Sequence, residues 1–172
     1  MIDQMTQPTS SATLRYTTVS SPIGELLLLG DDEALHGLYM QDGRKPTRIA
    51  ASWERSAAPF ADVCAQLQEY FAGVRTSFDV RLAPRGAEFE LRGWRALQDI
   101  PNGETVSYGE IARRVSQPQA ARAVGLANGR NPIAVIVPCH RVIGADGSLT
   151  GYGGGLERKR LLLELESAQG RL

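Results

Sequence analysis

The chain has 172 residues, of which 42% are hydrophobic and 22% charged, and its formal net charge at pH 7 is zero. This length suits one domain or two small ones, and the composition argues against wholesale disorder. The longest apolar run is only a few residues, so no segment is expected to span a bilayer.

The first half of the chain predicts a small α/β domain. Residues 1–12 are polar and lack the pattern of a secretory signal, so we expect a flexible tail there. Apolar positions at helical spacing predict a helix over residues 60–72, which Gly73 ends. Strands are expected at 13–20, 24–30, 34–40 and 78–82. Residues 13–83 should therefore form antiparallel strands with a helix on one face.

The second half, residues 84–172, has a mainly helical pattern. Ser107 and Glu110 fit a capping box, and Pro118 suits the first turn of a further helix. Helices are expected at 89–100, 107–115, 117–129 and 156–168, with a flexible glycine-rich loop at 151–155. The two short central helices, broken by a turn, are typical of a helix-turn-helix.

Charge is distributed unevenly along the neutral chain. Residues 1–83 hold 7 Lys and Arg against 10 Asp and Glu, whereas residues 84–172 hold 12 against 9. From position 111 to 145 every charged residue is an arginine: Arg113, Arg114, Arg122, Arg130 and Arg141. This stretch indicates a face that binds a polyanion such as nucleic acid. The alternative is an ordinary solvated helix face whose counter-charges come from elsewhere in the fold.

Cys139 is the candidate nucleophile, because His140 and Arg141 follow it directly. A free thiol with a pKa near 8.5 is only about 3% thiolate at pH 7, so it needs a base or positive charge nearby. Adjacent side chains on an extended segment point to opposite faces, so His140 could help only across a tight turn or through a bridging water. The alternative is a buried, inert cysteine.

Other cysteine chemistries lack their sequence patterns. Val142 stands where a Cys-x-x-Cys motif needs its second cysteine, and Ala145 stands where a cysteine phosphatase loop needs an arginine. No zinc-ligand spacing is found among Cys64, Cys139, His36 and His140. We therefore expect neither a metal nor another cofactor. Two cysteines are too few for a disulfide framework, which favours a cytoplasmic location.

Three short motifs surround the candidate nucleophile. They are Asn131-Pro132, Pro138-Cys139-His140-Arg141-Val142 and Gly151-Tyr152-Gly153-Gly154. Together they resemble the signature of the 6-O-alkylguanine-DNA alkyltransferases, also called methylated-DNA–protein-cysteine methyltransferases. The resemblance is dense over residues 89–166 and looser over the first 83 residues.

The resemblance implies DNA repair by direct reversal. The alkyl group on the 6-oxygen of guanine in duplex DNA would pass irreversibly to Cys139, once per protein molecule, after the damaged nucleotide has flipped out of the helix. His140 matches the base that deprotonates the thiol through a water, and Glu166 matches the carboxylate that orients the histidine. Singly, Glu166 could instead be a partner of Arg160 or Lys159.

Further roles follow from the same resemblance. Asn131 matches the residue that braces the cysteine turn, and Tyr108 matches the phenol that donates a proton toward the departing guanine. Arg122 matches the finger that fills the gap left by the nucleotide. Taken singly, Tyr108 could be an ordinary interfacial tyrosine and Arg122 a solvated helix residue. The remaining base-pocket and DNA-binding residues implied are Val142, Tyr152, Gly153, Gly154, Ser107 and Ala121.

The resemblance also implies a fold and a partner. It predicts a ribonuclease H-like first domain and a second domain with a winged helix-turn-helix that binds the minor groove of double-stranded DNA. The zinc ligands of some members have no counterparts here. A monomer in solution is expected, with cooperative assembly on DNA left open. Gly93 departs from the family pattern, because a larger apolar residue is expected before Trp94, and this predicts a loosened helix.

Two other functions remain open from the residues alone. A non-catalytic module could bind the lesion on the same fold without removing the alkyl group, but it would not need Cys139 with its histidine and glutamate. An unrelated cysteine hydrolase would turn over on esters or peptides and would not need the basic stretch.

Overall fold

The computed structural model describes residues 13–169, so the tail expected at 1–12 lies outside the described residues. The chain divides into two compact units, Met1–Arg85 and Gly86–Leu172. Within residues 13–169 no helix combines the length and apolar character needed to cross a membrane.

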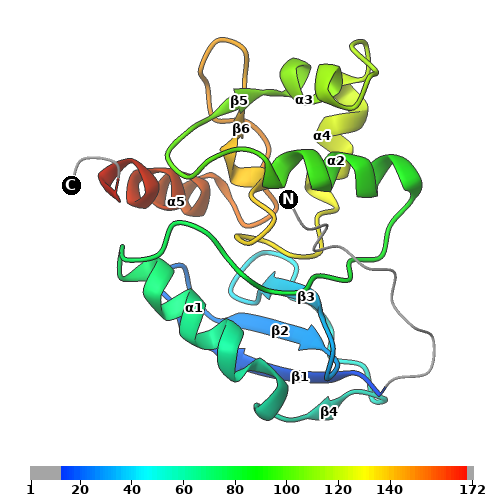
Figure 1. Ribbon diagram of the computed structural model, residues 1–172, viewed down its shortest axis with the longest axis vertical. Coiled ribbons are helices and arrows are strands. Elements are labelled where there is room, and N and C mark those ends of the chain that lie inside the picture. Colours follow the sequence, from blue (N-terminus) through cyan, green and yellow to red (C-terminus); the bar gives the residue numbers. More distant parts are fainter. Residues whose placement is uncertain (1–12, 170–172) are drawn as a thin grey trace. The chain divides into compact units, whose positions relative to one another are not determined.

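The first unit is built on a sheet of strand order β3-β2-β1-β4 (Figure 1). The strands are β1 (Arg15–Val19), β2 (Leu26–Gly30), β3 (Leu35–Met40) and β4 (Glu54–Arg55). Strand β2 is the continuous apolar run Leu-Leu-Leu-Leu-Gly and is buried throughout, as a central strand should be. It pairs antiparallel with β1 and β3. A helical turn, η1 (Ala58–Phe60), leads into α1 (Ala61–Phe71), which places Val63, Leu67 and Tyr70 in the core.

Two expectations for this unit need correction. The strand expected at 78–82 is absent from the described structure, where that segment touches β3 only through an isolated bridge between Leu35 and Leu82. The two-residue strand β4, which pairs parallel with β1, makes the sheet mixed rather than purely antiparallel. Because β4 is fully exposed and carries no apolar pattern, the sequence offered no signal for it.

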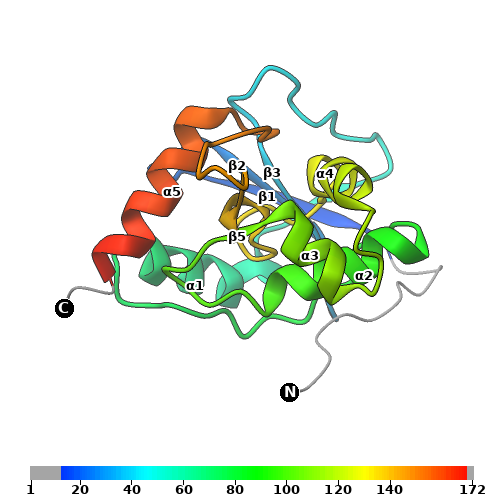
Figure 2. The same cartoon turned by 90° about the horizontal axis from the view of Figure 1, so that it is seen from above.

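The second unit contains α2 (Glu88–Gln98), α3 (Tyr108–Arg114), α4 (Ala121–Gly129) and α5 (Leu156–Gln169). Helices α2, α3 and α4 pack against one another (Figure 2). Two short parallel strands, β5 (Val106–Ser107) and β6 (Val142–Ile143), were not expected from the sequence. The helical turn η2 (Cys139–Arg141) directly precedes β6.

Helix α2 runs without interruption through Gly93. A Cβ atom at this position would lie 4.0 Å from the Cβ atom of Ala127, an ordinary van der Waals distance, so two small residues face each other where α2 packs against α4. Trp94 strengthens this contact, because its indole Nε1–H donates to the Ala127 carbonyl at 2.8 Å. Gly93 therefore lies in the contact between α2 and α4, and α2 continues through it without a break.

The helix-turn-helix begins as expected but its second helix starts later. Ser107 caps α3 by accepting a hydrogen bond from the Glu110 N–H at 3.1 Å, while the Glu110 carboxylate binds arginines instead of completing a capping box. Ser116 has a positive φ of 62°, which reverses the chain. Pro118 therefore lies in the connecting turn, and α4 begins at Ala121 rather than at 117.

Candidate active site

Cys139 lies on a tight turn rather than on an extended strand. It opens the helical turn η2, so the argument that adjacent side chains must diverge does not apply. The backbone before it is irregular, and Val135 has a φ of 70°, an unusual value for a β-branched residue. The chain therefore needs other contacts to hold this conformation.

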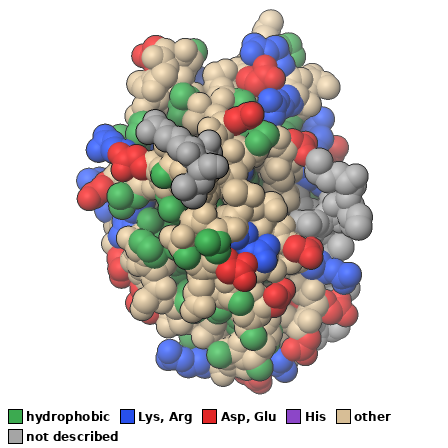
Figure 3. Space-filling model, turned by 60° about the vertical axis from the view of Figure 1, so that its left-hand side comes forward, with side chains coloured by type: hydrophobic (Ala, Val, Ile, Leu, Met, Phe, Trp, Pro, Cys, Tyr) green, Lys and Arg blue, Asp and Glu red, His purple; other side chains and the backbone are tan. Residues whose placement is uncertain are grey.

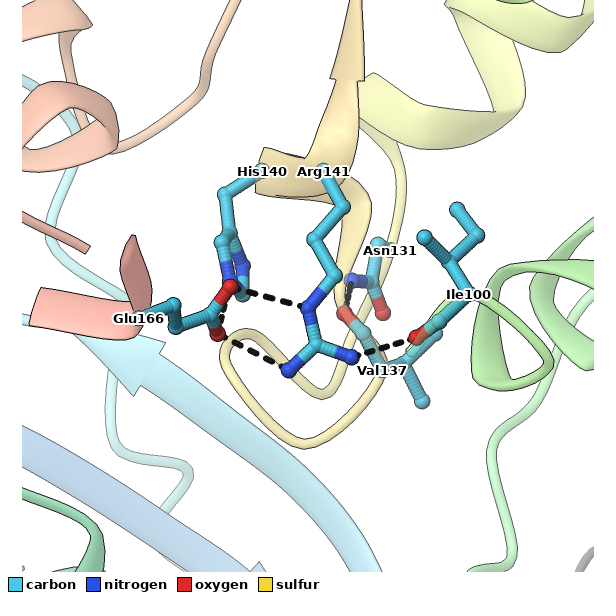
Figure 4. Close-up of polar contacts among 6 residues, drawn as sticks. All are labelled: Ile100, Asn131, Val137, His140, Arg141 and Glu166. Carbon is cyan, nitrogen blue, oxygen red and sulfur yellow. Dashed lines mark hydrogen bonds and ion pairs between the residues drawn. The ribbon is translucent and has the colours of Figure 1, made fainter. Parts of the chain in front are cut away.

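Asn131 supplies those contacts. Its Oδ1 accepts from the Ile133 N–H at 3.0 Å, and its Nδ2 donates to the Val137 carbonyl at 2.8 Å (Figure 4). The same amide donates to the Cys139 Sγ at 3.2 Å. One side chain thus ties the strained turn to the sulfur atom.

The Cys139 thiol lies in a poorly solvated position, with 8% of the residue exposed. Burial raises the pKa of this thiol, and the Asn131 hydrogen bond and the positive charge of Lys159 work in the opposite direction. Because the net shift is upward, the resting side chain is protonated at neutral pH. Nucleophilic attack therefore requires a base.

His140 and Glu166 form a buried pair that fixes the orientation of the imidazole. The His140 Nε2 lies 2.7 Å from the Glu166 Oε1, and both side chains are almost completely buried. Burial tends to raise the pKa of Glu166, but hydrogen bonds from His140 and Arg141 outweigh it and bring the pKa to about 2. An ionised carboxylate can only accept, so Nε2 carries the proton.

The other ring nitrogen of His140, Nδ1, is able to accept a proton. Its Nδ1 is buried and has no hydrogen-bond partner among the residues that the structure describes. Burial lowers the pKa of His140, and the Glu166 carboxylate partly opposes this shift, so the imidazole is neutral at rest. A neutral ring protonated at Nε2 presents the Nδ1 lone pair as a proton acceptor.

Arg141 completes a buried cluster and does not belong to a polyanion-binding surface. Its Nε and Nη2 donate to the two Glu166 oxygens at 3.0 and 2.8 Å, and its Nη1 donates to the Ile100 carbonyl at 2.6 Å. Figure 4 shows His140 and Arg141 converging on this one carboxylate. Glu166 therefore pairs with the two residues that follow Cys139.

Lys159 is the functional candidate that the sequence reading missed. Its side chain is fully buried, and its Nζ donates to the Val142 and Thr150 carbonyls at 2.6 and 2.8 Å. The interaction with the Cys139 sulfur raises its pKa, against a larger lowering by burial. Lys159 precedes Glu166 by two helical turns on α5, so their shared face was a signal available in the sequence.

Tyr108 reaches the same backbone oxygen as Lys159. Its hydroxyl donates to the Thr150 carbonyl at 3.1 Å. The ring lies beside α4, because a side chain at Gly125 would approach its Cδ1 and Cε1 atoms to 3.9 Å. The phenol and the buried ammonium thus meet at Thr150, although they come from α3 and α5.

The residues expected to wall the base pocket lie on β6 and in the loop before α5. Val142 is completely buried directly after η2. Tyr152, Gly153 and Gly154 lie in the loop before α5, where the Gly154 carbonyl accepts from Arg158 at 2.8 Å. The part of this loop in a base pocket stays a prediction.

Most of the arginines in the basic stretch have acidic partners. Glu110 binds Arg113 and Arg114, while Glu90 binds Arg130. The face drawn in Figure 3 likewise mixes side chains of both charges. Arg122 differs, because it is exposed on α4 and makes no hydrogen bond or ion pair with another described residue. The solvated-face alternative therefore explains the partnered surface arginines, and Arg122, next to the half-buried Ala121, is available to a ligand.

The described residues contain no cluster of three or more His, Cys, Asp or Glu side chains able to hold a metal ion. The thiol interacts with the Lys159 ammonium, the ammonium and the Tyr108 phenol share the Thr150 carbonyl, and the neutral imidazole is bound to the Glu166 carboxylate. This set can form a thiolate, take up its proton and donate a proton to a leaving group.

Two family models match nearly the whole chain. Residues 14–84 match the 6-O-methylguanine DNA methyltransferase ribonuclease-like domain, and residues 88–168 match the DNA-binding domain of the same family.

Similar proteins and a similar solved structure point to the same family. The chain is 58% identical over 154 residues to a methylated-DNA–protein-cysteine methyltransferase of Mycolicibacterium paratuberculosis, which covers 89% of this chain and 92% of that protein. It is 53% identical to the protein of the same name from Methanosarcina acetivorans, and the match covers 89% of this chain and 98% of that protein. Among solved structures, Mycobacterium tuberculosis OGT in complex with DNA is similar, with a TM-score of 0.84, 55% identity and coverage of 90% and 94%.

Proposed function

The chain belongs to the 6-O-methylguanine DNA methyltransferase family, and on that premise we propose that Cys139 is the residue that accepts the alkyl group. The protein repairs alkylated DNA by direct reversal, moving the alkyl group from guanine to a cysteine. We choose Cys139 over Cys64 because its sulfur accepts a hydrogen bond from Asn131 and interacts with the buried cation Lys159. The pKa of Cys64, by contrast, is raised by burial alone.

The first step forms the thiolate. The Cys139 proton passes through a water to His140 Nδ1, the ring nitrogen without a partner among the described residues. The resulting imidazolium is stabilised by Glu166, whose ionised carboxylate already accepts from Nε2. Lys159 offsets the new negative charge on sulfur, because it is the cation whose interaction lowers the thiol pKa.

The second step is a displacement at the alkyl carbon. The sulfur forms a bond to this carbon, the carbon–oxygen bond breaks, and its electron pair remains with the guanine. Tyr108 donates a proton toward the departing base, for which its hydroxyl must leave the Thr150 carbonyl. The product thioether offers water no good leaving group, so each molecule reacts once.

The substrate we propose is double-stranded DNA carrying an alkylated guanine that flips out of the stack. Extrusion costs a few kcal/mol, less for a poorly paired lesion. Arg122 is exposed and without a described partner, which suits it to occupy the vacated space. Phosphate contacts should supply most of the affinity and make binding strongly salt-dependent. We further propose that the protein works as a monomer in the cytoplasm, where reducing conditions keep the thiol free.

Transfer of a labelled methyl group from duplex DNA tests this proposal. Label should appear on the wild-type protein and on the Cys64→Ser control, and it should be lost in Cys139→Ser. Binding to damaged DNA without transfer would instead support a lesion-binding module. A protein that neither binds damaged DNA nor takes up its methyl group would favour a cysteine hydrolase.

A further inference from the structure

Helix α4 presents a large apolar side chain outward, where the packing of the unit does not require it. Leu126 is 64% exposed, whereas Val124 and Ala127 of the same helix are buried against the rest of the unit. Single exposed leucines are common on protein surfaces, so the role of Leu126 depends on which residues lie beside it on α4.

Leu126 shares its face of α4 with the proposed finger residue. Arg122 stands four positions before it on α4, and both side chains are exposed. Positions four apart lie one above the other on a helix, about 6 Å apart along its axis. One arginine and one leucine therefore stand next to each other on the exposed face of α4.

The positions three before and three after Leu126 on α4 are Ala123 and Gly129, so Arg122 and Leu126 rise above small residues. A helix is about 10 Å or more across and the undeformed minor groove is roughly 6 Å wide, so side chains that rise from the helix reach the base edges first. Proteins that act in this groove commonly insert apolar wedges beside arginines.

We infer that Leu126 acts as a wedge beside Arg122, packing against the base step next to the vacated position and keeping water out of it. This inference rests on the proposed function. The spacing supports it, because about 6 Å along α4 is less than two base steps of roughly 3.4 Å, which keeps Leu126 within reach of the step beside the position that Arg122 fills. Leu126 is thereby a specificity residue for duplex DNA, with no part in the chemistry at Cys139.

Comparison of three substrates tests the inference in Leu126→Ala. The single-turnover rate on methylated duplex should fall about tenfold, equivalent to about 1.4 kcal/mol. The rates on free alkylated guanine and on single-stranded DNA should be unchanged. The salt dependence of duplex binding should also be unchanged, because no charge is removed. Leu126→Met should restore most of the duplex rate, since it keeps a long apolar side chain.

Leu161→Ala is the matched control, because Leu161 is 43% exposed on α5. It should behave as wild type on all three substrates. A duplex rate in Leu126→Ala equal to wild type, or an equal loss on free base and duplex, would overturn the inference. Neither result would affect the proposed function, which fails only if the wild-type protein does not take the methyl group.

Discussion

The Nε2 atom of His140 lies 2.7 Å from Oε1 of Glu166, although 26 positions separate the two residues. Arg141 donates to the same carboxylate, so one side chain on α5 holds both residues that follow Cys139. The orientation of the imidazole and the conformation of the cysteine turn therefore depend on the charge of Glu166.

Stability should fall in acid because of this cluster. The pKa of Glu166 drops from 4.5 to about 2 on folding, so its contribution is complete above pH 4.5 and is lost as the pH falls toward 2. The lost contribution is on the order of 3 kcal/mol. The lowered pKa of His140 acts in the same direction below pH 6.5. Urea unfolding measured from pH 7 to pH 2 checks the expected fall.

Glu166→Gln should flatten this acid dependence and lower stability at neutral pH, because Arg141 loses its countercharge while remaining buried. Glu164→Gln is the matched control, since Glu164 is exposed on the same helix. An acid dependence equal in all three proteins would show that Glu166 ionisation does not stabilise the fold.

Removal of the buried cation should make the thiol harder to ionise. In Lys159→Met the pKa of Cys139 should rise, because a positive charge that lowers it is gone. A rise of one pKa unit slows methyl transfer about tenfold at neutral pH. The pH–rate profile should shift to higher pH, with recovery in alkaline buffer, and the exposed Arg160→Met should show no shift. A loss that is uniform at every pH would indicate packing damage instead.

Tyr108→Phe should slow the reaction without unfolding the protein. The substitution removes the hydrogen bond that the hydroxyl donates to the Thr150 carbonyl, worth about 1 kcal/mol of stability, and the longer one that it accepts from the Thr150 Oγ1 at 3.4 Å. A positioned proton donor contributes at least about a hundredfold to rate, so transfer from free alkylated guanine should fall by roughly that factor. Single-turnover kinetics and urea unfolding measured on the same sample separate the two effects. An unchanged rate would remove Tyr108 from the mechanism.

Arg122→Ala should impair repair of duplex DNA more than reaction with the free base. Arg122 is proposed to act on base extrusion, and a free base has no stack to leave. Its lack of a described partner means that the substitution breaks no known contact within the fold. The measurement is the ratio of single-turnover rates on the two substrates, and equal losses on both would contradict the assigned role.

Local patterns were sufficient for the elements with strong periodicity. The apolar run Leu26–Gly30 and the helical spacing before Gly73 predicted β2 and α1 because burial follows directly from those patterns. The exposed β4 and the late start of α4 depend on pairing with β1 and on the turn at Ser116, which no local pattern reports.

One motif identified the residues around Cys139 in the sequence, but it gave no information on which charged residues are buried. The surroundings of Cys139 were readable from the residues adjacent to it. Arg141 and Lys159 looked like surface cations in the sequence, yet both are buried. Their burial depends on the Glu166 carboxylate and on the Val142 and Thr150 carbonyls, which only the tertiary structure brings to them.

The most direct test titrates the protein with duplex DNA carrying methylated guanine and maps the modified peptide by mass spectrometry. We expect S-methylcysteine at position 139, a plateau at one methyl group per chain, and restored guanine in an equal amount. Methyl groups on another residue, or repair that continues after every chain has reacted, would contradict the account.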